Sequence, residues 1–400
     1  MLASLMERER WPVLLPQAPL TGEPRVLVVS GSVGSGHDGV ADELTARLRG
    51  RGLFVQQRDY LDALPSWGKV LLREGYTSSV SHAPALFEWL FGAIERPGTP
   101  ASAATQWLCS LAGPTLQGWL EEGVDAVVST YPFASWSLGQ LRARGGAPMA
   151  LVTVLTDPAA HRFWVHDRVD HHVTVSAATA AQGQLQYGIT MRAGGTLVPP
   201  AFEQRCSIRR ARVREELRLR PEDAMALMTT GSLGIGDVAA GARALARSGV
   251  AVPVVLCGRN QALRQQLDVR LSGTGARVLG WRPDMPDMVN AADVLVHNAG
   301  GQSLSEAWAA RVPAVSFSPL PGHGRANAAV LEQSGLVPWA RNDAELPAMV
   351  ATQMRTRPSE QPGLGADLDT TAFVADLAAN HCQGRQPPTR DGRSRTQTAA

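Results

Sequence analysis

A glycine turn in the carboxyl-terminal half has the residue types that suit a phosphate. The turn, Ala299-Gly300-Gly301, follows the apolar run 293–297 and precedes a helical pattern over 302–311. If the run is a buried strand, the turn lies at its carboxyl end, where open α/β sheets bind ligands. Free N–H groups and the positive dipole end of the helix would then face the ligand. Glu306, early in this helix, would be within reach of a sugar hydroxyl; an ordinary turn with a solvated glutamate is the alternative.

Three other loops follow apolar runs in the same way. The run 25–30 leads into the glycine loop 31–37 and then into a helix that we expect to begin at Asp38. Strand, glycine loop and helix are typical of a nucleotide-binding α/β domain, although the spacing is not that of the dinucleotide motif. The run 225–230 leads into a second candidate phosphate cradle, Gly231-Ser232-Leu233-Gly234. The run 252–256 leads into Cys257-Gly258-Arg259-Asn260, where the guanidinium could hold a phosphate as a rigid fork.

His37 and Asp157 are the candidate acid–base residues. His37 lies at the amino end of a predicted helix, where the dipole disfavours its charged form and a neutral imidazole could act as a base. A capping or core histidine is the alternative. Asp157 ends the predicted strand 149–156 and precedes a polar and aromatic loop that contains His161 and Trp164. That position is typical of an active-site rim, although it also suits a common helix-capping aspartate.

The elements that must position these residues form two similar halves. Apolar runs of strand length alternate with helical patterns up to a proline-containing linker at 194–202, and the same alternation begins again after it. An α/β fold with two domains is therefore predicted. We expect a leader at 1–20, a first domain at 21–200, a second at 201–350, carboxyl-terminal helices at 351–382 and a disordered tail at 383–400.

Composition excludes several classes of protein. The chain is 44% hydrophobic and 18% charged, which predicts a globular protein with large cores, and its net charge of +2 is too small to favour nucleic acid as a partner. The four cysteines are scattered without metal-ligand spacing, which favours a reducing compartment and no zinc site. The amino terminus lacks a signal-peptide pattern, and no run approaches the roughly 20 apolar residues of a membrane span. A cytoplasmic location is expected.

Two segments allow both a structural and a membrane-related interpretation. Residues 63–111 are helical in pattern and rich in aromatic residues, and 83–94 is their most apolar part. This part could be a lipid-binding face or simply core. The predicted helix 205–220 is rich in arginine, which either forms a solvated face or contacts anionic lipid; its arginines include Arg209, Arg210, Arg212, Arg214 and Arg218.

Six motifs together resemble the monogalactosyldiacylglycerol synthase group of glycosyltransferase family 28. They occur in the right order between residues 25 and 340 as GSVGSGH at 31–37, TDPAAHRFW at 156–164, GSLG at 231–234, CGRN at 257–260, GWRPDMPDM at 280–288 and AGGQSLSEA at 299–307. The resemblance implies the GT-B fold, in which two Rossmann-like domains face each other across a cleft. The first domain would bind the acceptor and the second a UDP-sugar.

The resemblance also implies a role for each matched residue. His37 would deprotonate the acceptor hydroxyl, with Asp157 as a second catalytic residue, and Glu306 would bind the ribose. The acceptor side would include Gly34, Gly36, His161 and Trp164. The donor side would include Gly231, Ser232, Arg259, Trp281, Met285, Gly300, Gly301, Gln302, Ser303, Glu306, His323 and Asn327.

The chain departs from the family pattern at two places. Asp38 follows His37 where the group usually has a basic or small residue. The loop usually written PGQE is Pro321-Gly322-His323-Gly324, so the Gln and Glu expected to hold the hexose hydroxyls are absent. Asn327, a few residues later, matches the pattern.

The resemblance implies an inverting UDP-sugar hexosyltransferase with a lipid acceptor such as diacylglycerol, peripheral on an anionic membrane. No metal cofactor is expected, because helix amino ends and an arginine can stabilise the leaving UDP. The chain's one DxD, Asp367-Leu368-Asp369, lies outside the matched motifs. The alternatives are transfer to a soluble small molecule, a non-catalytic UDP-sugar-binding protein and, on the same scaffold, a UDP-sugar epimerase.

Overall fold

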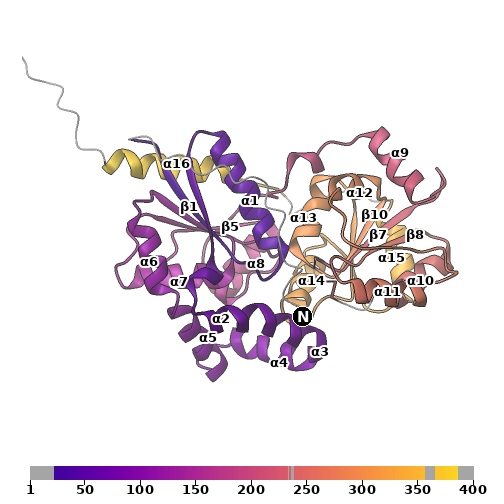
Figure 1. Cartoon of the computed structure of the whole chain (residues 1–400), viewed down its shortest axis with the longest axis horizontal. Coiled ribbons are helices and arrows are strands. Elements are labelled where there is room, and N and C mark those ends of the chain that lie inside the picture. The colour runs from indigo at the N-terminus through magenta and orange to yellow at the C-terminus, as the bar shows by residue number, and fades with distance from the viewer. Residues whose placement is uncertain (1–21, 233, 236–237, 356–364, 386–400) are drawn as a thin grey trace, which may run out of the picture.

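The chain forms two parallel β-sheets with helices on both faces (Figure 1). The computed structural model describes residues 22–232, 234–235, 238–355 and 365–385. The predicted leader 1–20 and most of the predicted tail 383–400 lie outside these ranges. The strand order is β2-β1-β3-β4-β5-β6 in the first sheet and β12-β11-β10-β7-β8-β9 in the second. The predicted α/β fold with two Rossmann-like domains is confirmed.

The strands form where the sequence has short apolar runs. Central strands are buried on both faces, as β-branched residues in parallel sheets require. The first sheet contains β1 (Arg25–Ser30), β2 (Phe54–Asp59), β3 (Ala126–Ser129), β4 (Ala150–Val154), β5 (His171–Thr174) and β6 (Met191–Ala193). The second contains β7 (Met225–Thr229), β8 (Val252–Leu256), β9 (Arg277–Leu279), β10 (Val294–His297), β11 (Ala314–Phe317) and β12 (Trp339–Ala340).

The helices divide between the two sheets, except that the last one returns to the first. The first half has α1 (Ser35–Gly50), α2 (Ser66–Val70), α3 (Tyr76–His82), α4 (Pro84–Glu95), α5 (Pro100–Ser110), α6 (Gly113–Glu121), α7 (Pro132–Ala143) and α8 (Ala177–Tyr187). The second has α9 (Ser207–Glu216), α10 (Ala239–Ser248), α11 (Gln261–Arg270), α12 (Met285–Ala291), α13 (Gly301–Ala309), α14 (His323–Gln333) and α15 (Leu346–Gln353). The last helix, α16 (Thr370–Arg385), packs Val374 and Ala378 against β1 of the first sheet.

The strand orders place the functional loops opposite each other. The strand order changes direction across the sheet between β1 and β3 in the first sheet and between β7 and β10 in the second, while all strands remain parallel. Ligands of open α/β sheets bind beyond the carboxyl ends of strands at such reversals. Helix α1 follows β1, helix α13 follows β10, and the two helices contact each other between the domains (Figure 1).

Helix α1 begins earlier than the sequence pattern predicts. It starts at Ser35, after Gly34 in an extended conformation, so His37 lies inside its first turn. The Asp38 carboxylate accepts hydrogen bonds from the hydroxyls of Ser30 and Ser32, at 2.8 and 2.9 Å. The unusual Asp38 therefore orders the glycine loop that leads to His37.

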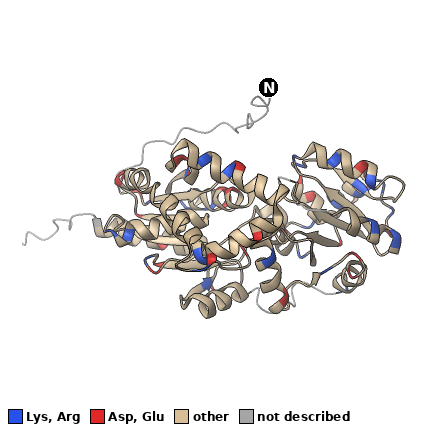
Figure 2. Cartoon of the chain, turned by 90° about the horizontal axis from the view of Figure 1, so that it is seen from below, with Lys and Arg blue, Asp and Glu red and all other residues tan. Residues whose placement is uncertain are grey.

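Several arginines of helix α9 form ion pairs within the second domain. Arg210 lies 2.6 Å from Asp293, and its guanidinium also donates to carbonyl groups at the carboxyl end of α12. Arg212 lies 2.8 Å from Asp287, and Arg214 lies 3.2 Å from Asp293. Arg210 and Arg214 hold α9 against α12, so the interpretation as a solvated face was wrong for these two, whereas the Arg212 side chain is 66% exposed and fits it. Elsewhere the basic and acidic side chains are interspersed on the face shown in Figure 2.

Candidate active site

The hydrogen bonds of His37 define the state of its imidazole. Nδ1 lies 2.8 Å from the carbonyl oxygen of Thr130, at the carboxyl end of β3. A carbonyl only accepts, so Nδ1 carries the hydrogen and Nε2 keeps its lone pair. The hydroxyl of Thr156 lies 3.0 Å from Nδ1, and the hydroxyl of Thr130 donates to the backbone carbonyl of His37. The ring is thus held as a neutral imidazole with Nε2 free to accept a proton.

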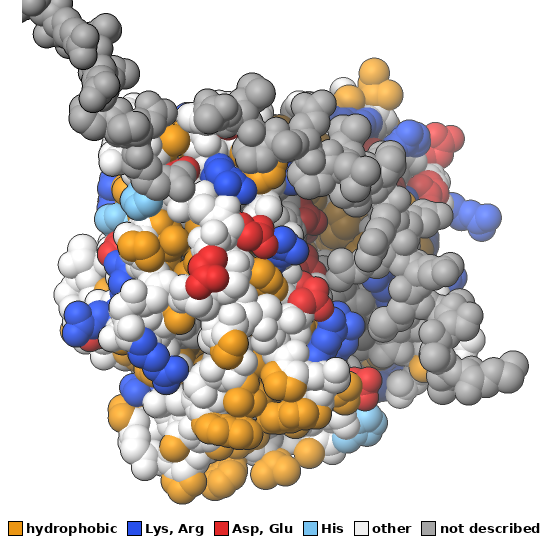
Figure 3. Space-filling model, turned by 60° about the vertical axis from the view of Figure 1, so that its left-hand side comes forward, with side chains coloured by type: hydrophobic (Ala, Val, Ile, Leu, Met, Phe, Trp, Pro, Cys, Tyr) orange, Lys and Arg blue, Asp and Glu red, His pale blue; other side chains and the backbone are white. Residues whose placement is uncertain are grey.

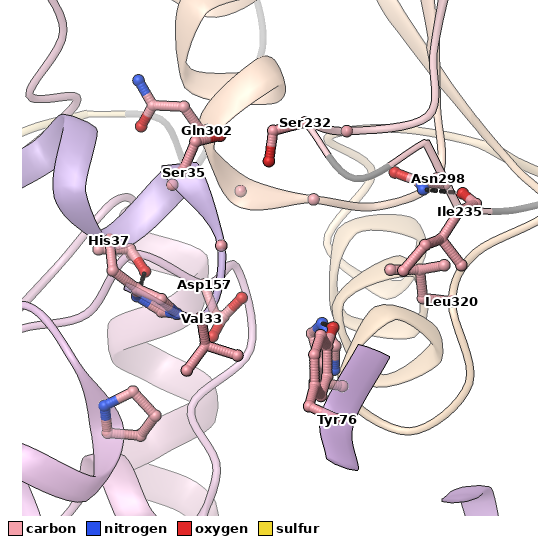
Figure 4. A pocket seen from close by; sticks show the side chains of 18 of the residues that line it. Val33, Ser35, His37, Tyr76, Asp157, Ser232, Ile235, Asn298, Gln302 and Leu320 are labelled. Atoms are coloured by element: carbon pink, nitrogen blue, oxygen red, sulfur yellow. Dashed lines mark hydrogen bonds between the residues drawn. The ribbon is translucent and has the colours of Figure 1, made fainter. Parts of the chain in front are cut away.

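Burial lowers the pKa of His37, against the opposing effect of the Asp157 carboxylate. The imidazole is therefore neutral at physiological pH, as a base requires. The nearby carboxylate favours the charged form that would appear once the ring has taken a proton. Figure 4 shows His37 and Asp157 close together on one wall of the cavity.

Asp157 is held by groups from both domains. Its Oδ2 accepts from the indole Nε1 of Trp164 at 3.0 Å, and its Oδ1 accepts from the side chain of Asn327 at 3.1 Å. Burial alone would raise the pKa of Asp157, but His323, His161 and His37, together with the Asn327 hydrogen bond, lower it. The carboxylate is thus ionised and surrounded by imidazoles.

The glycine turn after β10 lies directly against the loop after β4. A Cβ atom at Gly301 would lie 2.0 Å from the carbonyl oxygen of Thr156, so only glycine allows this approach between the domains. Gly301 is the first residue of α13, and no side chain caps that helix end. Its free N–H groups are the ones that suit an anion.

The loop after β7 is interlocked with the loop after β8. The carbonyl oxygen of Ser232 accepts from the N–H of Arg259 at 3.0 Å. A Cβ at Gly258, which has a φ of 55°, would lie 2.5 Å from the carbonyl oxygens of Gly231 and Ser232. The exposed guanidinium of Arg259 stacks 4.4 Å from the centroid of the Trp281 ring. These contacts place Ser232 at the cavity wall and keep Arg259 above Trp281.

Glu306 lies on the next turn of α13, half-buried at the wall of the cavity. Burial raises the pKa of Glu306 to about 7, although a hydrogen bond from the Gln302 amide at 3.2 Å lowers it. A carboxylate with so little solvation gains from any hydroxyl donor that enters the site. Glu306 can therefore accept a hydrogen bond from a sugar hydroxyl.

The altered loop after β11 contacts helices of the first domain. His323 Nε2 lies 3.4 Å from the hydroxyl of Tyr76. The N–H of Gly322 donates to the carboxylate of Glu88 on α4 at 2.7 Å. Gly322 has a φ of 70°, and a Cβ there would lie 2.9 Å from the Phe91 ring. The second domain is thus pressed against α3 and α4 of the first.

A cavity of about 630 Å³ lies between these two sets of loops. His37 and Asp157 line it from the first domain, and Ser232, Gly301 and Glu306 line it from the second. At its other end the walls are apolar side chains of the α3–α5 region. The cavity therefore has one end suited to a polar, anionic ligand and one end suited to an apolar ligand.

The sequence is similar to those of known glycolipid-forming enzymes. Residues 37–192 match the family model of monogalactosyldiacylglycerol (MGDG) synthase. The processive diacylglycerol beta-glucosyltransferase of Bacillus mycoides is 26% identical over 348 residues, covering 81% of this chain and 84% of that protein. Its Bacillus cereus counterpart is 25% identical over 349 residues, with the same coverage.

Solved structures agree on the architecture. The crystal structure of Acinetobacter baumannii MurG has a TM-score of 0.51 at 16% identity, with 91% of this chain and 96% of that chain covered. Arabidopsis thaliana UGT89C1 complexed with UDP has a TM-score of 0.56 at 17% identity, with 90% and 100% covered. The chain is a glycosyltransferase whose sequence is similar to the monogalactosyldiacylglycerol synthase group. The GT-B fold implied by the resemblance is confirmed.

The cavity of this glycosyltransferase brings together most of the predicted site residues. His37, Asp157, Gly34, Gly36 and His161 line it from the first domain. From the second domain its lining includes Gly231, Ser232, Trp281, Met285, Gly300, Gly301, Gln302, Ser303, Glu306 and His323. Figure 4 shows Gln302 and Ser232 at the same cavity, above His37 and Asp157 in that view.

Three predicted residues of the glycosyltransferase lie outside the cavity lining. Trp164 is fully buried and supports Asp157 from behind, so it does not face an acceptor in this structure. Asn327 is also buried and its amide is used between the domains. Arg259 is exposed on Trp281, at the edge of the site. The prediction that Arg259 meets a phosphate stays a prediction.

Several residues of the site were missed by sequence reasoning. Thr130 follows a predicted strand at 124–129, so the rule that ligands lie beyond strand ends could have found it. Tyr76, Glu88 and Phe91 lie on helices that show no such pattern, and only the packing of the two domains brings them to the site.

Two structural observations concern metal binding and membrane insertion. Within the residues that the structure describes, no three His, Cys, Asp or Glu side chains are grouped so that they could hold a metal ion. No helix in the described part of the chain has the length and apolar character needed to cross a bilayer.

The raised pKa of Glu306 leads to a pH prediction for donor binding. We expect the affinity for UDP-glucose to fall about tenfold as the pH is lowered from about 8 to about 6, because the bound ribose favours an ionised carboxylate. UDP-glucose is the right probe, since its diphosphate does not titrate in this range. Calorimetric titration checks this. A Glu306→Gln variant should bind weakly at every pH, and a variant with wild-type pH dependence would contradict the assignment.

Proposed function

We propose that this glycosyltransferase moves a hexose from a UDP-sugar to the hydroxyl of a membrane lipid such as diacylglycerol. The main support for the proposal is that one cavity is lined by Gly301 and Glu306, by His37, and at its other end by apolar side chains. The similar Bacillus proteins are named as diacylglycerol glucosyltransferases, which supports a lipid acceptor.

The proposed reaction is a direct displacement. His37 Nε2 takes the proton of the acceptor hydroxyl while its oxygen bonds to the anomeric carbon of the hexose. The bond from that carbon to the β-phosphate oxygen breaks, and its electron pair leaves with UDP. Attack opposite the leaving group inverts the anomeric centre. Asp157 favours the imidazolium that forms.

The departing diphosphate gains charge as this bond breaks. In the proposal the N–H groups at the start of α13, with those of the Ser232 loop, meet this charge. Glu306 holds the ribose. Activity should then persist in excess chelator, because these groups perform the task that a divalent cation has in metal-dependent transferases.

Release of UDP tests the proposal. The protein is incubated with UDP-glucose, UDP-galactose or UDP-N-acetylglucosamine, with and without diacylglycerol vesicles and with chelator present. We expect UDP only when the lipid and one of the donors are both present. Release without an acceptor indicates hydrolysis, release only with a soluble alcohol indicates another substrate class, and UDP binding without release indicates a sensor. Each of these outcomes would contradict the proposal.

We also propose that the protein docks on the membrane through an apolar patch on the α2–α5 region. Figure 3 shows hydrophobic side chains gathered at the lower end of the first domain, where Figure 1 places these helices. The apolar patch consists of Trp67, Val70, Leu71, Leu86, Trp89, Leu90 and Trp107. Leu71 and Leu90 also line the cavity, so the apolar patch continues into its apolar end. A lipid could reach His37 without leaving apolar surroundings.

The tryptophans of the apolar patch allow a test. Trp89 is 68% exposed and Trp107 is 58% exposed, more than an indole usually is on a monomer surface. We expect the double variant Trp89→Ser and Trp107→Ser to lower vesicle binding about tenfold or more, since two large apolar side chains are removed. Co-sedimentation with phosphatidylcholine and phosphatidylglycerol vesicles measures it. Leu185→Ser, at a 90% exposed position on α8, is the matched control and should bind as wild type. Equal binding of all three proteins would contradict the docking surface.

A further inference from the structure

The side-chain amide of Asn327 has all its donors engaged by protein atoms. Nδ2 donates to the Asp157 carboxylate at 3.1 Å and to the backbone carbonyl of Ala299 at 3.0 Å, while Oδ1 accepts from the N–H of Ala159 at 3.0 Å. The orientation of the amide is unambiguous, because a backbone N–H requires an oxygen and a carbonyl requires a nitrogen. Both hydrogens of Nδ2 are therefore used.

These three partners belong to different domains. Asp157 and Ala159 lie in the loop after β4 of the first sheet, whereas Ala299 lies in the turn after β10 of the second. Asn327 itself is on α14 of the second domain and is 1% exposed. One buried side chain thus joins the loop on the His37 side to the turn that presents α13.

The turn that Asn327 holds has an unusual backbone. Ala299 has a φ of 65° and is fully buried. Non-glycine residues adopt this left-handed conformation rarely, and they keep it only where surrounding contacts enforce it. The hydrogen bond from Asn327 to the Ala299 carbonyl is such a contact. The next residues, Gly300 and Gly301, lead into α13 against the Thr156 carbonyl.

We propose that Asn327 is a positioning residue that ties the carboxylate of Asp157 to the phosphate-binding turn. When a UDP-sugar occupies that turn, Asn327 would then hold Asp157 in place beside His37. This role differs from the donor contact that sequence resemblance implies for Asn327. It rests on the proposed function, because it assigns the turn to the diphosphate. The amide touches neither substrate in this arrangement.

The role predicts a specific change in catalysis. The Asp157 carboxylate is faced by His37, His161, His323 and Tyr76 as well as by the Asn327 amide. Asn327→Ala removes one hydrogen-bond donor from that carboxylate. The pKa of Asp157 should then rise, and its carboxylate should no longer be aligned with the turn. We expect Asn327→Ala to lower kcat by about 10- to 100-fold, the range typical of a lost hydrogen bond to a charged group.

A near-isosteric variant separates positioning from packing. Asn327→Asp keeps the shape but places a second carboxyl beside Asp157, and only its protonated form can donate. The ratio of its rate to the wild-type rate should rise as the pH is lowered. A purely structural role would give a ratio that does not depend on pH. Asn290→Ala is the matched control: Asn290 is a buried asparagine whose amide donates to the Gln204 carbonyl, remote from Asp157.

The experiment measures UDP-hexose turnover on diacylglycerol vesicles from pH 5.5 to 8.5, with calorimetric titration of UDP and UDP-glucose. Melting temperatures verify that each variant is folded. The expected result is a loss in kcat for both Asn327 variants, with the affinity ratio of UDP-glucose to UDP unchanged. A wild-type kcat in folded variants would overturn the inference, and so would a change confined to that affinity ratio, which would mean that Asn327 contacts the hexose. Failure of the wild-type protein to transfer hexose would instead contradict the proposed function.

Discussion

Replacement of His37 by alanine should lower hexose transfer by at least about 100-fold, the usual contribution of a general base. The Thr130 carbonyl holds Nδ1, so Nε2 is the atom that would take the acceptor proton. Binding of UDP should persist, because the phosphate-binding turns lie on the other domain. Steady-state turnover and calorimetric UDP titration measure the two effects separately. His171→Ala, at the start of β5, is the control for loss of a histidine.

The pH profile gives a second view of the same residue. Burial holds the pKa of His37 below its ordinary value of 6.5. A base must be unprotonated, so kcat/KM for the lipid, measured with saturating UDP-sugar so that donor binding through Glu306 does not limit the rate, should stay at its plateau as the pH falls to 6.5 and decline only below it. A wild-type rate in His37→Ala, or an acid limb well above pH 6.5, would remove His37 from the role of base.

Gly301→Ala should be nearly as damaging as loss of the base. Its Cβ would lie 2.0 Å from the carbonyl oxygen of Thr156, which is backbone and can move away only if the two domains separate. A displacement of about 1 Å at the reacting groups costs on the order of 100-fold in rate. We therefore expect at least about a 100-fold loss in kcat/KM, measured as UDP release with saturating lipid.

The neighbouring glycine provides the comparison. A Cβ at Gly300 would meet only the side-chain oxygen of Asn298 at 3.8 Å, an ordinary contact, and the φ of Gly300 is −70°. Gly300→Ala should therefore lose far less activity than Gly301→Ala. If the two variants were equally active, the close approach of the domains at Gly301 would not belong to the working state.

The strands and their loops could be predicted because their signals are local. Runs such as 25–30 and 225–230 are apolar on both faces, which parallel strands require, and the glycine turns follow them directly. Because the glycine turns follow the strands directly in the sequence, they must lie at the carboxyl ends of those strands. For this reason the sequence alone marks Gly301, Glu306 and His37 as candidate site residues, and the structure places all three at one cavity.

The remaining features depend on pairs of residues that are distant in the chain. Asn327 and Asp157 are 170 positions apart, and Glu88 and Gly322 are 234 apart. No local pattern marks such pairs, since only the docking of the two domains creates them. The same limit explains why Arg210 and Arg214 of α9 were interpreted as solvent-facing, since their partner Asp293 is about 80 positions away in the chain. Helix α1 was placed three residues late because glycines at 34 and 36 suggested a loop, whereas Asp38 stabilises a helix start there.

Analysis of the product is the most direct test of the central claim, that both domains together transfer a hexose to a lipid. The protein is incubated with UDP-glucose labelled in its hexose and with diacylglycerol vesicles, and the lipid and water phases are examined by mass spectrometry and by NMR of the anomeric proton. We expect labelled hexose joined to the lipid hydroxyl, with the anomeric configuration opposite to that of the donor. Label found only in water, in an epimeric UDP-sugar, or in a lipid product of retained configuration would contradict it.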